Sequence, residues 1–279
     1  LRRVRRLAQS AAGIGAGGFS ERLPVVGGDE FADLARTFND LLSRLETAFR
    51  QQTRLVEQQR RFTADASHEL KTPLTIIKGN TSFALAEGGE EATYRQSLQE
   101  IDRAADTMSH LVGDLLLLAR SDEGQLGRGR VDLPLREILE RSLAQATRKG
   151  TATPVRLASA DADLRVMGNE AELISLFGNL LDNALRHTPS GGGVTLDAVQ
   201  NGSQTVVTVA DTGTGIAAKH LPHLGERFYR VDDARSRPDG GTGLGLSICR
   251  GIVEGHGGTI TFQSQIGVGT TVLVTLPAT

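Results

Sequence analysis

Apolar side chains in the first 120 residues recur at intervals of three and four, the spacing of amphipathic helices. Two of these series have heptad spacing. The first follows the acidic pair Asp29-Glu30 and consists of Phe31, Leu34, Phe38, Leu41, Leu45 and Ala48; the second consists of Ile101, Ala104, Met108, Leu111, Leu115 and Leu118. Between them, residues 51–86 contain no helix breaker except Pro73 and Gly79, and Gly88-Gly89 marks a turn. The pattern predicts a hairpin of two long helices.

A shorter helix is predicted at the start of the chain, where apolar residues again follow helical spacing: Leu1, Val4, Ala8 and Ala11. Glycines and one proline between Gly13 and Gly28 exclude a continuing helix and predict a flexible connector that contains Pro24. A single long hairpin buries too little apolar surface by itself, so two copies are expected to form a four-helix bundle. The chain is therefore predicted to be a homodimer.

The pattern changes after Arg120, where a polar run containing three glycines is interpreted as a linker over residues 123–130. Beyond it, helical stretches at residues 133–148, 170–187 and 244–255 alternate with strand-like segments. These segments are Val155–Leu157, Leu164–Val166, Val194–Val199, Thr205–Ala210, Thr259–Gln263 and Thr270–Leu276. The second half of the chain is therefore predicted to be an α/β sandwich.

Composition narrows the class of protein. With 279 residues, 33 Gly, 9 Phe and no Trp, the chain is expected to form two or three modules rather than one large core. A net charge of −2 argues against nonspecific binding of nucleic acid. The single cysteine, Cys249, excludes an internal disulfide, and no Cys/His cluster has zinc-site spacing. No apolar run approaches the roughly 18 residues of a membrane span.

The first six residues, Leu-Arg-Arg-Val-Arg-Arg, include four arginines and no initiator Met. We expect the chain to be part of a longer protein. Two interpretations of the basic cluster remain open at this point. It is either a solvated helix face or the cytoplasmic flank of a membrane helix that precedes it.

The clearest candidate for chemistry in the helical half is the segment from Arg61 to Thr75, in which His68 lies shortly before Pro73. Proline inside a helix removes a hydrogen bond at a cost of about 3 kcal/mol, so its presence points to a site. Thr72 follows His68 by four residues and lies on the same helical face. A carboxylate such as Glu69 could hold the Nδ1 hydrogen and leave Nε2 as a nucleophile. A histidine alone would more often be an ordinary surface residue.

The second half contains three further blocks. Asn179 and Asn183 lie on one helical face, where their amide oxygens could ligate Mg²⁺ and Arg186 could reach phosphate oxygens. Asp211 ends a strand, where it could accept a hydrogen bond from an exocyclic amine, and the glycines at 213 and 215 would let backbone approach a flat ring. Taken separately, the asparagine pair could be structural and the Asp-x-Gly-x-Gly segment a common turn.

The third block is a glycine-rich loop, residues 239–245, that opens a helix and offers backbone N–H groups to phosphates. It fits neither the P-loop pattern nor the Rossmann fingerprint. A basic segment precedes it, with arginines at 227, 230, 235 and 237. This segment is either a mobile lid over a triphosphate or a solvated loop.

In this order the blocks resemble the sensor histidine kinases of bacterial two-component systems, over nearly the whole chain. Residues 1–50 resemble a HAMP signal-relay domain, and residues 51–122 the dimerisation and histidine-phosphotransfer hairpin (HisKA). After the linker at 123–130, residues 131–279 resemble the catalytic ATP-binding domain of the Bergerat type (GHKL, HATPase_c). The fold implied is multidomain: an all-α HAMP domain and a dimeric four-helix-bundle hairpin, followed by an α/β sandwich.

The resemblance also implies roles for individual residues. It makes His68 the phosphoacceptor, Glu69 its base, and Thr72 the residue that positions water for phosphatase activity. It makes Asn183 and Asn179 the holders of Mg²⁺ and phosphate, and Asp211 the residue that recognises adenine. The full ATP-contacting set it implies is Asn179, Asn183, Arg186, His187, Asp211, Gly213, Gly215, Arg227, Arg230, Gly241, Thr242, Gly243, Leu244 and Gly245. Family members usually carry Phe where this chain has Gly225.

The activity implied is autophosphorylation of His68 from Mg-ATP, followed by transfer to an aspartate of a response regulator, together with phosphatase activity on that regulator. Two alternatives are a sensor that acts mainly as a phosphatase and an ATP-binding scaffold without kinase turnover. The expected cofactors are ATP and Mg²⁺. The expected partners are a second copy, the response regulator and a membrane-spanning sensor region upstream. By the resemblance, the full-length protein lies in the cell membrane and this chain is its cytoplasmic portion.

Overall fold

The computed structural model describes residues 22–86, 91–147, 153–160, 163–231 and 242–279. The short helix predicted near Leu1, the glycines between Gly13 and Gly18 and the Gly88-Gly89 turn lie outside these ranges. The chain divides into two compact units, Leu1–Ser67 and His68–Thr279, which are considered separately. In the described residues no helix is both long and apolar enough to cross a membrane.

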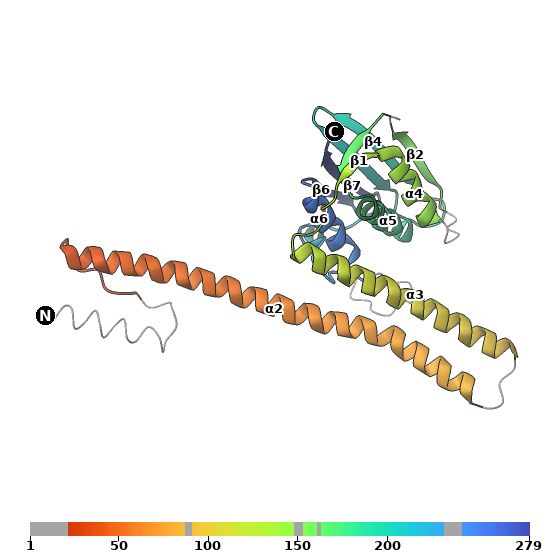
Figure 1. Ribbon diagram of the computed structural model, residues 1–279, viewed down its shortest axis with the longest axis horizontal. Helices are drawn as coiled ribbons and strands as arrows, with labels where there is room; N and C mark the ends of the chain where they lie inside the picture. Colours follow the sequence, from red (N-terminus) through yellow and green to blue (C-terminus); the bar gives the residue numbers. More distant parts are fainter. Residues whose placement is uncertain (1–21, 87–90, 148–152, 161–162, 232–241) are drawn as a thin grey trace. The chain divides into compact units, whose positions relative to one another are not determined.

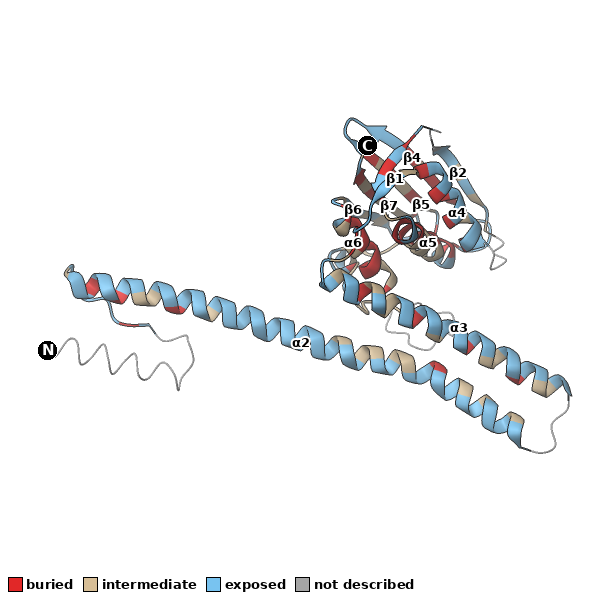
Figure 2. Ribbon diagram, viewed as in Figure 1, coloured by how far each residue is buried: buried red, intermediate tan, exposed pale blue. Residues whose placement is uncertain are grey.

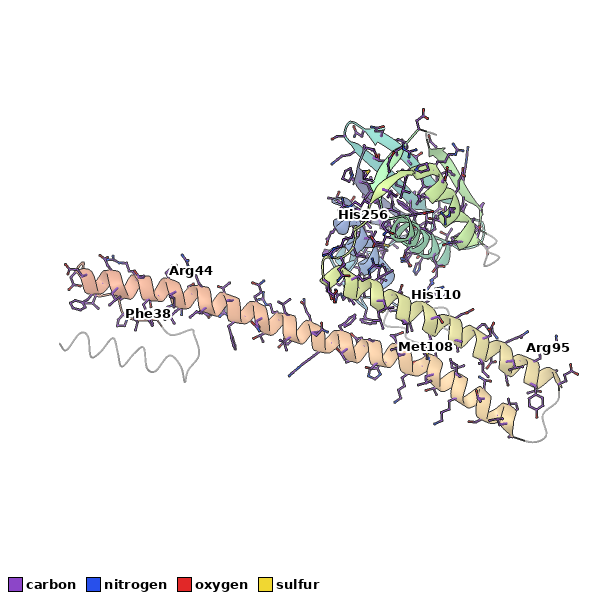
Figure 3. All side chains as sticks on the ribbon, in the orientation of Figure 1. Phe38, Arg44, Arg95, Met108, His110 and His256 are labelled. Atoms are coloured by element: carbon purple, nitrogen blue, oxygen red, sulfur yellow. The ribbon has the colours of Figure 1, made fainter. Side chains whose placement is uncertain are left out.

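In the first unit, the end of the connector packs on the beginning of helix α2 (Glu30–Leu85). Leu23, Ala35 and Leu42 form a small buried cluster, and Phe38 packs against it. Figure 3 labels Phe38 on α2. The side chain of Asn39 fixes the connector, because its Oδ1 accepts from Leu23 N at 2.7 Å and its Nδ2 donates to Leu23 O at 2.9 Å. The segment next to Pro24 is therefore bound to the helix rather than loose.

The apolar series with heptad spacing that was predicted on α2, called its seam below, lies mostly on the surface of the single chain. Five of its six members are exposed: Phe31, Leu34, Leu41, Leu45 and Ala48. The positions that the chain itself buries are shifted by one residue, to Ala35 and Leu42, because the connector covers that side of the helix. The predicted homodimer stays a prediction.

The second unit begins within α2 and continues through α3 (Glu91–Asp122). Asn80 Nδ2 donates to Glu100 Oε2 at 3.1 Å and sets the register of the two helices. Of the predicted α3 seam, Ala104, Leu111 and Leu118 are buried, which confirms its inward face. Helix α2 continues through Pro73, which is buried.

The remainder of this unit is a sheet with helices on one face (Figure 1). The five-stranded sheet has the order β2 (Val155–Ala160), β4 (Val194–Asn201), β5 (Gln204–Asp211), β7 (Gly269–Pro277), β6 (Thr259–Gln265). Strands β2 and β4 are parallel, and the other neighbours are antiparallel. A separate antiparallel pair consists of β1 (Val131–Pro134) and β3 (Arg165–Gly168).

Three helices cover the sheet, with α5 (Glu170–His187) between α4 (Leu135–Thr147) and α6 (Gly245–Gly255). Alternate residues of the strands, such as Val207 and Val209 of β5, are buried under the helices, as the period of two requires (Figure 2). Phe177 of α5 is fully buried in this core. A short 3₁₀ helix, η1 (Ala218–His223), follows β5.

The predicted fold class is confirmed, with local differences. All six expected strands are present, but β1 was not expected. Its four residues end in a proline and carry no readable alternation, and the strand exists because it pairs with β3. The expected linker is also more ordered than a flexible spacer, because Leu126 and Gly127 are buried.

Candidate functional site

The predicted acceptor segment lies on α2, where His68 and Thr72 are exposed and Glu69 is half-buried. Thr72 Oγ1 donates to the backbone oxygen of His68 at 3.4 Å, so the two residues share one face of the helix. Glu69 makes no hydrogen bond to the His68 imidazole within the described residues, because consecutive helical residues point in different directions. The base role of Glu69 stays a prediction.

The asparagine pair of α5 lies at the edge of the helical layer. Asn179 and Asn183 are both half-buried, and their side-chain amides have no hydrogen-bond partner among the described residues. Gly245 starts α6 beside them, since a Cβ built there would lie 3.6 Å from Asn179 Oδ1. Amide oxygens, together with phosphate oxygens and water, are suitable ligands for Mg²⁺. The amide oxygens of Asn179 and Asn183 therefore fit this ion. Among the described residues no cluster of three or more His, Cys, Asp or Glu side chains could hold a metal.

Asp211 is held at the end of β5 by the backbone around it. Its Oδ1 accepts from Gly213 N at 2.8 Å and from Thr270 N at 3.2 Å, so the carboxylate has a fixed orientation. A Cβ at Gly213 would overlap the backbone oxygen of His187, and Thr214 N donates to that same oxygen at 3.2 Å. The fold thus brings the Asp211 loop and the C-terminus of α5 together. Oδ2 of Asp211 receives no hydrogen bond from the described residues and can accept one from a ligand amine.

The second glycine of this loop fixes it against β6. Gly215 has φ +67°, and a Cβ there would overlap the backbone oxygen of Gln265. Ile216 N donates to Ser264 Oγ at 2.8 Å. The loop is therefore a tight, preorganised turn, and a side chain at position 215 would push it away from β6.

The glycine-rich loop before α6 packs on the segment that follows η1. Phe228 N donates to Gly243 O at 2.9 Å, and a Cβ at Gly243 would lie 2.8 Å from the Phe228 backbone. Phe228 has φ +60°, a strained value for a bulky residue and one found preferentially at functional sites. Thr242 Oγ1 accepts from Leu244 N at 3.3 Å, and Leu244 is fully buried. Gly241, Arg235 and Arg237 lie outside the described residues.

Two of the predicted phosphate-binding arginines, Arg186 and Arg227, are paired with carboxylates in this structure. Arg186 Nη2 lies 2.6 Å from Asp182 Oδ2, one helical turn away, and Arg227 pairs with Asp122 at the end of α3. Arg230 is half-buried. Asp182, four residues earlier on the same helix, is within reach of Arg186, and the phosphate-binding role of Arg186 stays a prediction.

Gly225, the position at which the predicted family pattern has Phe, has φ +86°. A Cβ there would lie 3.1 Å from the guanidinium of Arg250, which donates to Leu224 O at 2.7 Å. The arginine thus packs over the glycine and ties this segment to α6.

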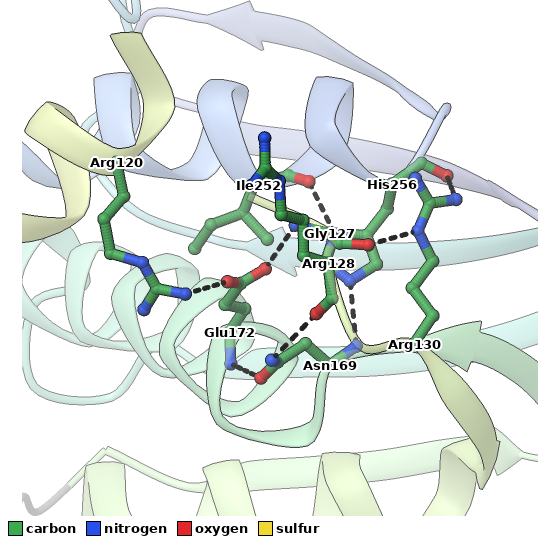
Figure 4. A network of polar contacts seen from close by, with 8 residues as sticks. All are labelled: Arg120, Gly127, Arg128, Arg130, Asn169, Glu172, Ile252 and His256. Atoms are coloured by element: carbon green, nitrogen blue, oxygen red, sulfur yellow. Dashed lines mark hydrogen bonds and ion pairs between the residues drawn. The ribbon is translucent and has the colours of Figure 1, made fainter. Parts of the chain in front are cut away.

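A buried polar network near the start of α5 was missed by the sequence analysis (Figure 4). Glu172 is 2 % exposed, and its Oε2 accepts from Gly127 N at 2.8 Å. Asn169 caps α5 by accepting from Glu172 N at 3.3 Å, and its own N–H donates to Nε2 of the buried His256 at 3.0 Å. Asn followed three residues later by Glu is the signature of a helix start, and this signal was available.

Two pKa values are displaced where α3 packs on α6. Burial raises the pKa of Asp114 from 3.8 to about 6, while the nearby charge of His110 (Figure 3) opposes this rise. Burial, with the charge of Asp114, also raises the pKa of the Cys249 thiol far above its usual range. Cys249 is fully buried and is therefore a packing residue, not a nucleophile.

Three family models match successive parts of the chain. Residues 1–47 match the HAMP domain, and residues 58–124 the His Kinase A (phospho-acceptor) domain. Residues 168–279 match the ATPase family described as histidine kinase-, DNA gyrase B- and HSP90-like.

Curated relatives show the same arrangement. The chain is 36 % identical to the signal transduction histidine-protein kinase BaeS of Escherichia coli over 98 % of its own length and 57 % of that protein's. It is 34 % identical to the sensor protein IrlS of Burkholderia pseudomallei, over 99 % of this chain and 58 % of that one. The chain thus spans somewhat more than half the length of these relatives.

Solved structures support the fold. The Acinetobacter baumannii histidine kinase AdeS has a TM-score of 0.54 at 22 % identity, over 75 % of this chain and 97 % of that one. The histidine kinase ThkA, solved in complex with response regulator protein TrrA, has a TM-score of 0.60 at 20 % identity, over 82 % of this chain and 65 % of that one.

A HAMP domain, a phospho-acceptor hairpin and a GHKL-type ATPase domain in this order define the class of the sensor kinases. The chain belongs to the sensor histidine kinases of bacterial two-component systems.

Proposed function

We propose that the chain transfers the γ-phosphoryl group of Mg-ATP to Nε2 of His68 and then passes it to an aspartate of a response regulator. The observation that carries this proposal is the presence, in one compact unit, of an exposed helical histidine and of the candidate nucleotide residues Asn183 and Asp211. Membership of the family supports the same activity.

In the first step, the Nε2 lone pair forms a bond to the γ-phosphorus, and the bond from that phosphorus to the bridging oxygen breaks, so that ADP leaves with the electron pair. The carboxylate of Glu69 holds the imidazole proton at Nδ1. In the second step, a regulator carboxylate attacks the phosphorus, the P–N bond breaks, and the imidazole recovers its electron pair. Positioning and neutralisation of charge supply most of the rate in such transfers.

The residues of the ATP domain have separable roles in this proposal. Asn179 and Asn183 hold Mg²⁺, which when bound neutralises phosphate charge, and Asp211 accepts from the adenine amine. The remaining members of the site line the ring or offer backbone and arginine donors to the phosphates. They are Arg186, His187, Gly213, Gly215, Arg227, Arg230, Gly241, Thr242, Gly243, Leu244 and Gly245.

The domain plan and the partners belong to the same proposal. The HAMP domain covers residues 1–50, the hairpin 51–122, the linker 123–130 and the ATP-binding domain 131–279. The chain works as a homodimer, and the exposed apolar seam of α2, with Leu34 and Leu41, supports this. The full-length protein places a sensor region in the membrane.

Incubation of the full chain with γ-labelled ATP and Mg²⁺ tests the activity. We expect an acid-labile, base-stable label that His68→Gln abolishes, while His110→Gln, a change of another exposed histidine on the hairpin, leaves it intact. Label retained in His68→Gln would exclude this histidine as the acceptor.

Phosphatase activity on the response regulator is a second candidate, favoured by the position of the Thr72 hydroxyl on the exposed face next to His68. Thr72→Ala should leave labelling of His68 intact and slow dephosphorylation of the regulator. Thr63→Ala is the control, because this exposed threonine lies five residues before His68 and therefore on a different face of the helix. An equal loss of both activities in Thr72→Ala would contradict a separate phosphatase role.

A further inference from the structure

The end of α3 is held closely against α6 by two glycines. Gly251 and Gly255 lie one turn apart on α6. A Cβ at Gly251 would lie 2.5 Å from Ser121 Oγ, and a Cβ at Gly255 would lie 2.8 Å from Leu126 Cβ. Larger side chains at these positions would separate the two elements. The chain after α3 is therefore packed on the ATP-binding domain, not suspended from it.

A buried carboxylate anchors the same junction from the side of α5. Glu172 accepts from the backbone N–H of Gly127 at 2.8 Å and pairs with Arg120 of α3 at 3.4 Å (Figure 4). Because Glu172 is 2 % exposed, removing its partners would leave a buried charge uncompensated, which is costly. The pairing thus favours the arrangement in which α3 stays on the domain.

Two helices connect this anchor to the nucleotide site. On α5, Glu172 precedes Asn179 by seven residues and Asn183 by eleven, close to two and three turns, so the three share one side of the helix. On α6, Gly245 lies beside Asn179, and Gly255 at the other end lies beside Leu126. Both helices therefore run from the anchor to the ATP site.

At this junction Asp122, the last residue of α3, forms an ion pair with Arg227. Arg227 directly precedes the strained Phe228, whose backbone packs on the glycine-rich loop. The contact joins Arg227 Nη2 to Asp122 Oδ1, and a carboxylate oxygen is the same kind of charged acceptor for a guanidinium as a phosphate oxygen. Asp122 therefore holds the arginine in the manner expected of a nucleotide phosphate.

We propose that Asp122 is an internal competitor of ATP for Arg227, placed there by the Glu172 anchor. ATP engagement and release of the end of α3 are then coupled: nucleotide phosphates displace Asp122, and a signal that moves α3 changes the affinity for ATP. This inference rests on the proposed function, in which Arg227 contacts phosphate.

Asp122→Asn in the full chain tests the competition, with Glu123→Gln as the control because Glu123 is the adjacent exposed carboxylate. The ion pair is partly exposed, so we expect Asp122→Asn to tighten Mg-ATP binding by about two- to fivefold. This gain in Mg-ATP affinity should be smaller at high salt, because salt screens the ion pair that Asp122→Asn removes. Adenosine, which lacks phosphates, should bind both variants equally. Equal Mg-ATP affinity in the two variants, or the same gain for adenosine, would overturn the proposal.

Glu172→Gln tests the anchor, since glutamine still accepts from Gly127 N but no longer pairs with the charge of Arg120. Glu170→Gln, which removes an exposed pair with Arg141 at the start of the same helix, is the control. We expect Glu172→Gln to tighten Mg-ATP binding, and Asp122→Asn to add little in the double variant, because both act through one arrangement. If the two gains in Mg-ATP affinity add fully in the double variant, Glu172 and Asp122 do not act through one arrangement.

Failure of this inference can be told apart from failure of the proposed function. If the wild-type chain shows no label that depends on His68, the proposed kinase activity fails. The affinities for Mg-ATP and adenosine still decide in that case whether Asp122 competes with phosphate. If label depends on His68 and the affinities of Asp122→Asn and Glu123→Gln coincide, the competition fails alone.

Discussion

Asp114 offers a test of how α3 packs on α6. Asp114 lies about one helical turn from each of the buried residues Leu111 and Leu118 of α3, it interacts with Cys249 of α6, and burial raises its pKa from 3.8 to about 6. Because the folded-state pKa is raised, the protonated form favours folding, and this stabilisation is lost as the pH rises from about 4 through 6. At 1.36 kcal/mol per pKa unit the full cost of the ionised group is at most about 3 kcal/mol. The side chain is only partly buried, which reduces the cost to about 1–2 kcal/mol.

Asp114→Asn removes the titrating group while preserving its shape. We expect the variant to be about 1–2 kcal/mol more stable than the wild type near pH 7.5, with a gain that grows between about pH 4 and 6 and then levels off. Urea unfolding followed by circular dichroism measures this, with Asp102→Asn, an exposed site on the same helix, as the control. A gain that does not depend on pH, or no gain near pH 7.5, would refute the reasoning.

Three further predictions concern the core, the nucleotide loop and the geometry of transfer. Phe177→Ala, at a fully buried position, should destabilise the ATP-binding domain by about 3–5 kcal/mol in urea unfolding, and a loss below 1 kcal/mol would contradict its central packing. Gly213→Ala should weaken ATP binding at least tenfold in titration calorimetry, because the new methyl group meets the His187 backbone, whereas Gly178→Ala has open space and should bind normally. Mixing His68→Gln chains with Asn183→Ala chains should restore labelling if transfer crosses a dimer, and an unlabelled mixture would indicate transfer within one chain.

Local periodicity was enough to predict most of the elements. The seam of α3 and the six strands depend on side-chain spacing within one segment, and the helix at Glu170–His187 was predicted at the bounds that the structure gives. The strand β1 was missed because its four residues acquire their conformation only by pairing with β3, some thirty positions later. Pairing over such a separation leaves no local pattern.

In the candidate site, too, some residues could be predicted from local sequence and others are brought together only by the fold. Asp211, Asn179 and Asn183 could be singled out because their residue types occur in a recognisable order, and the fold places Asp211 on a fixed backbone frame. Glu172 could not be assigned its burial from sequence, since a charged residue at the start of a helix is usually solvated. The pairing of Arg227 with Asp122 joins positions more than a hundred residues apart, and only the fold reveals it.

The central claim, that His68 receives the phosphoryl group, is tested most directly by locating that group in the chain. After incubation with Mg-ATP and tryptic digestion under basic conditions, mass spectrometry can examine the peptide of residues 62–71, in which His68 is the only histidine. The account predicts that this peptide gains one phosphoryl group, that fragmentation places it on His68, and that His68→Gln abolishes it. A phosphoryl group found only on Thr63, Ser67 or another peptide would contradict the account.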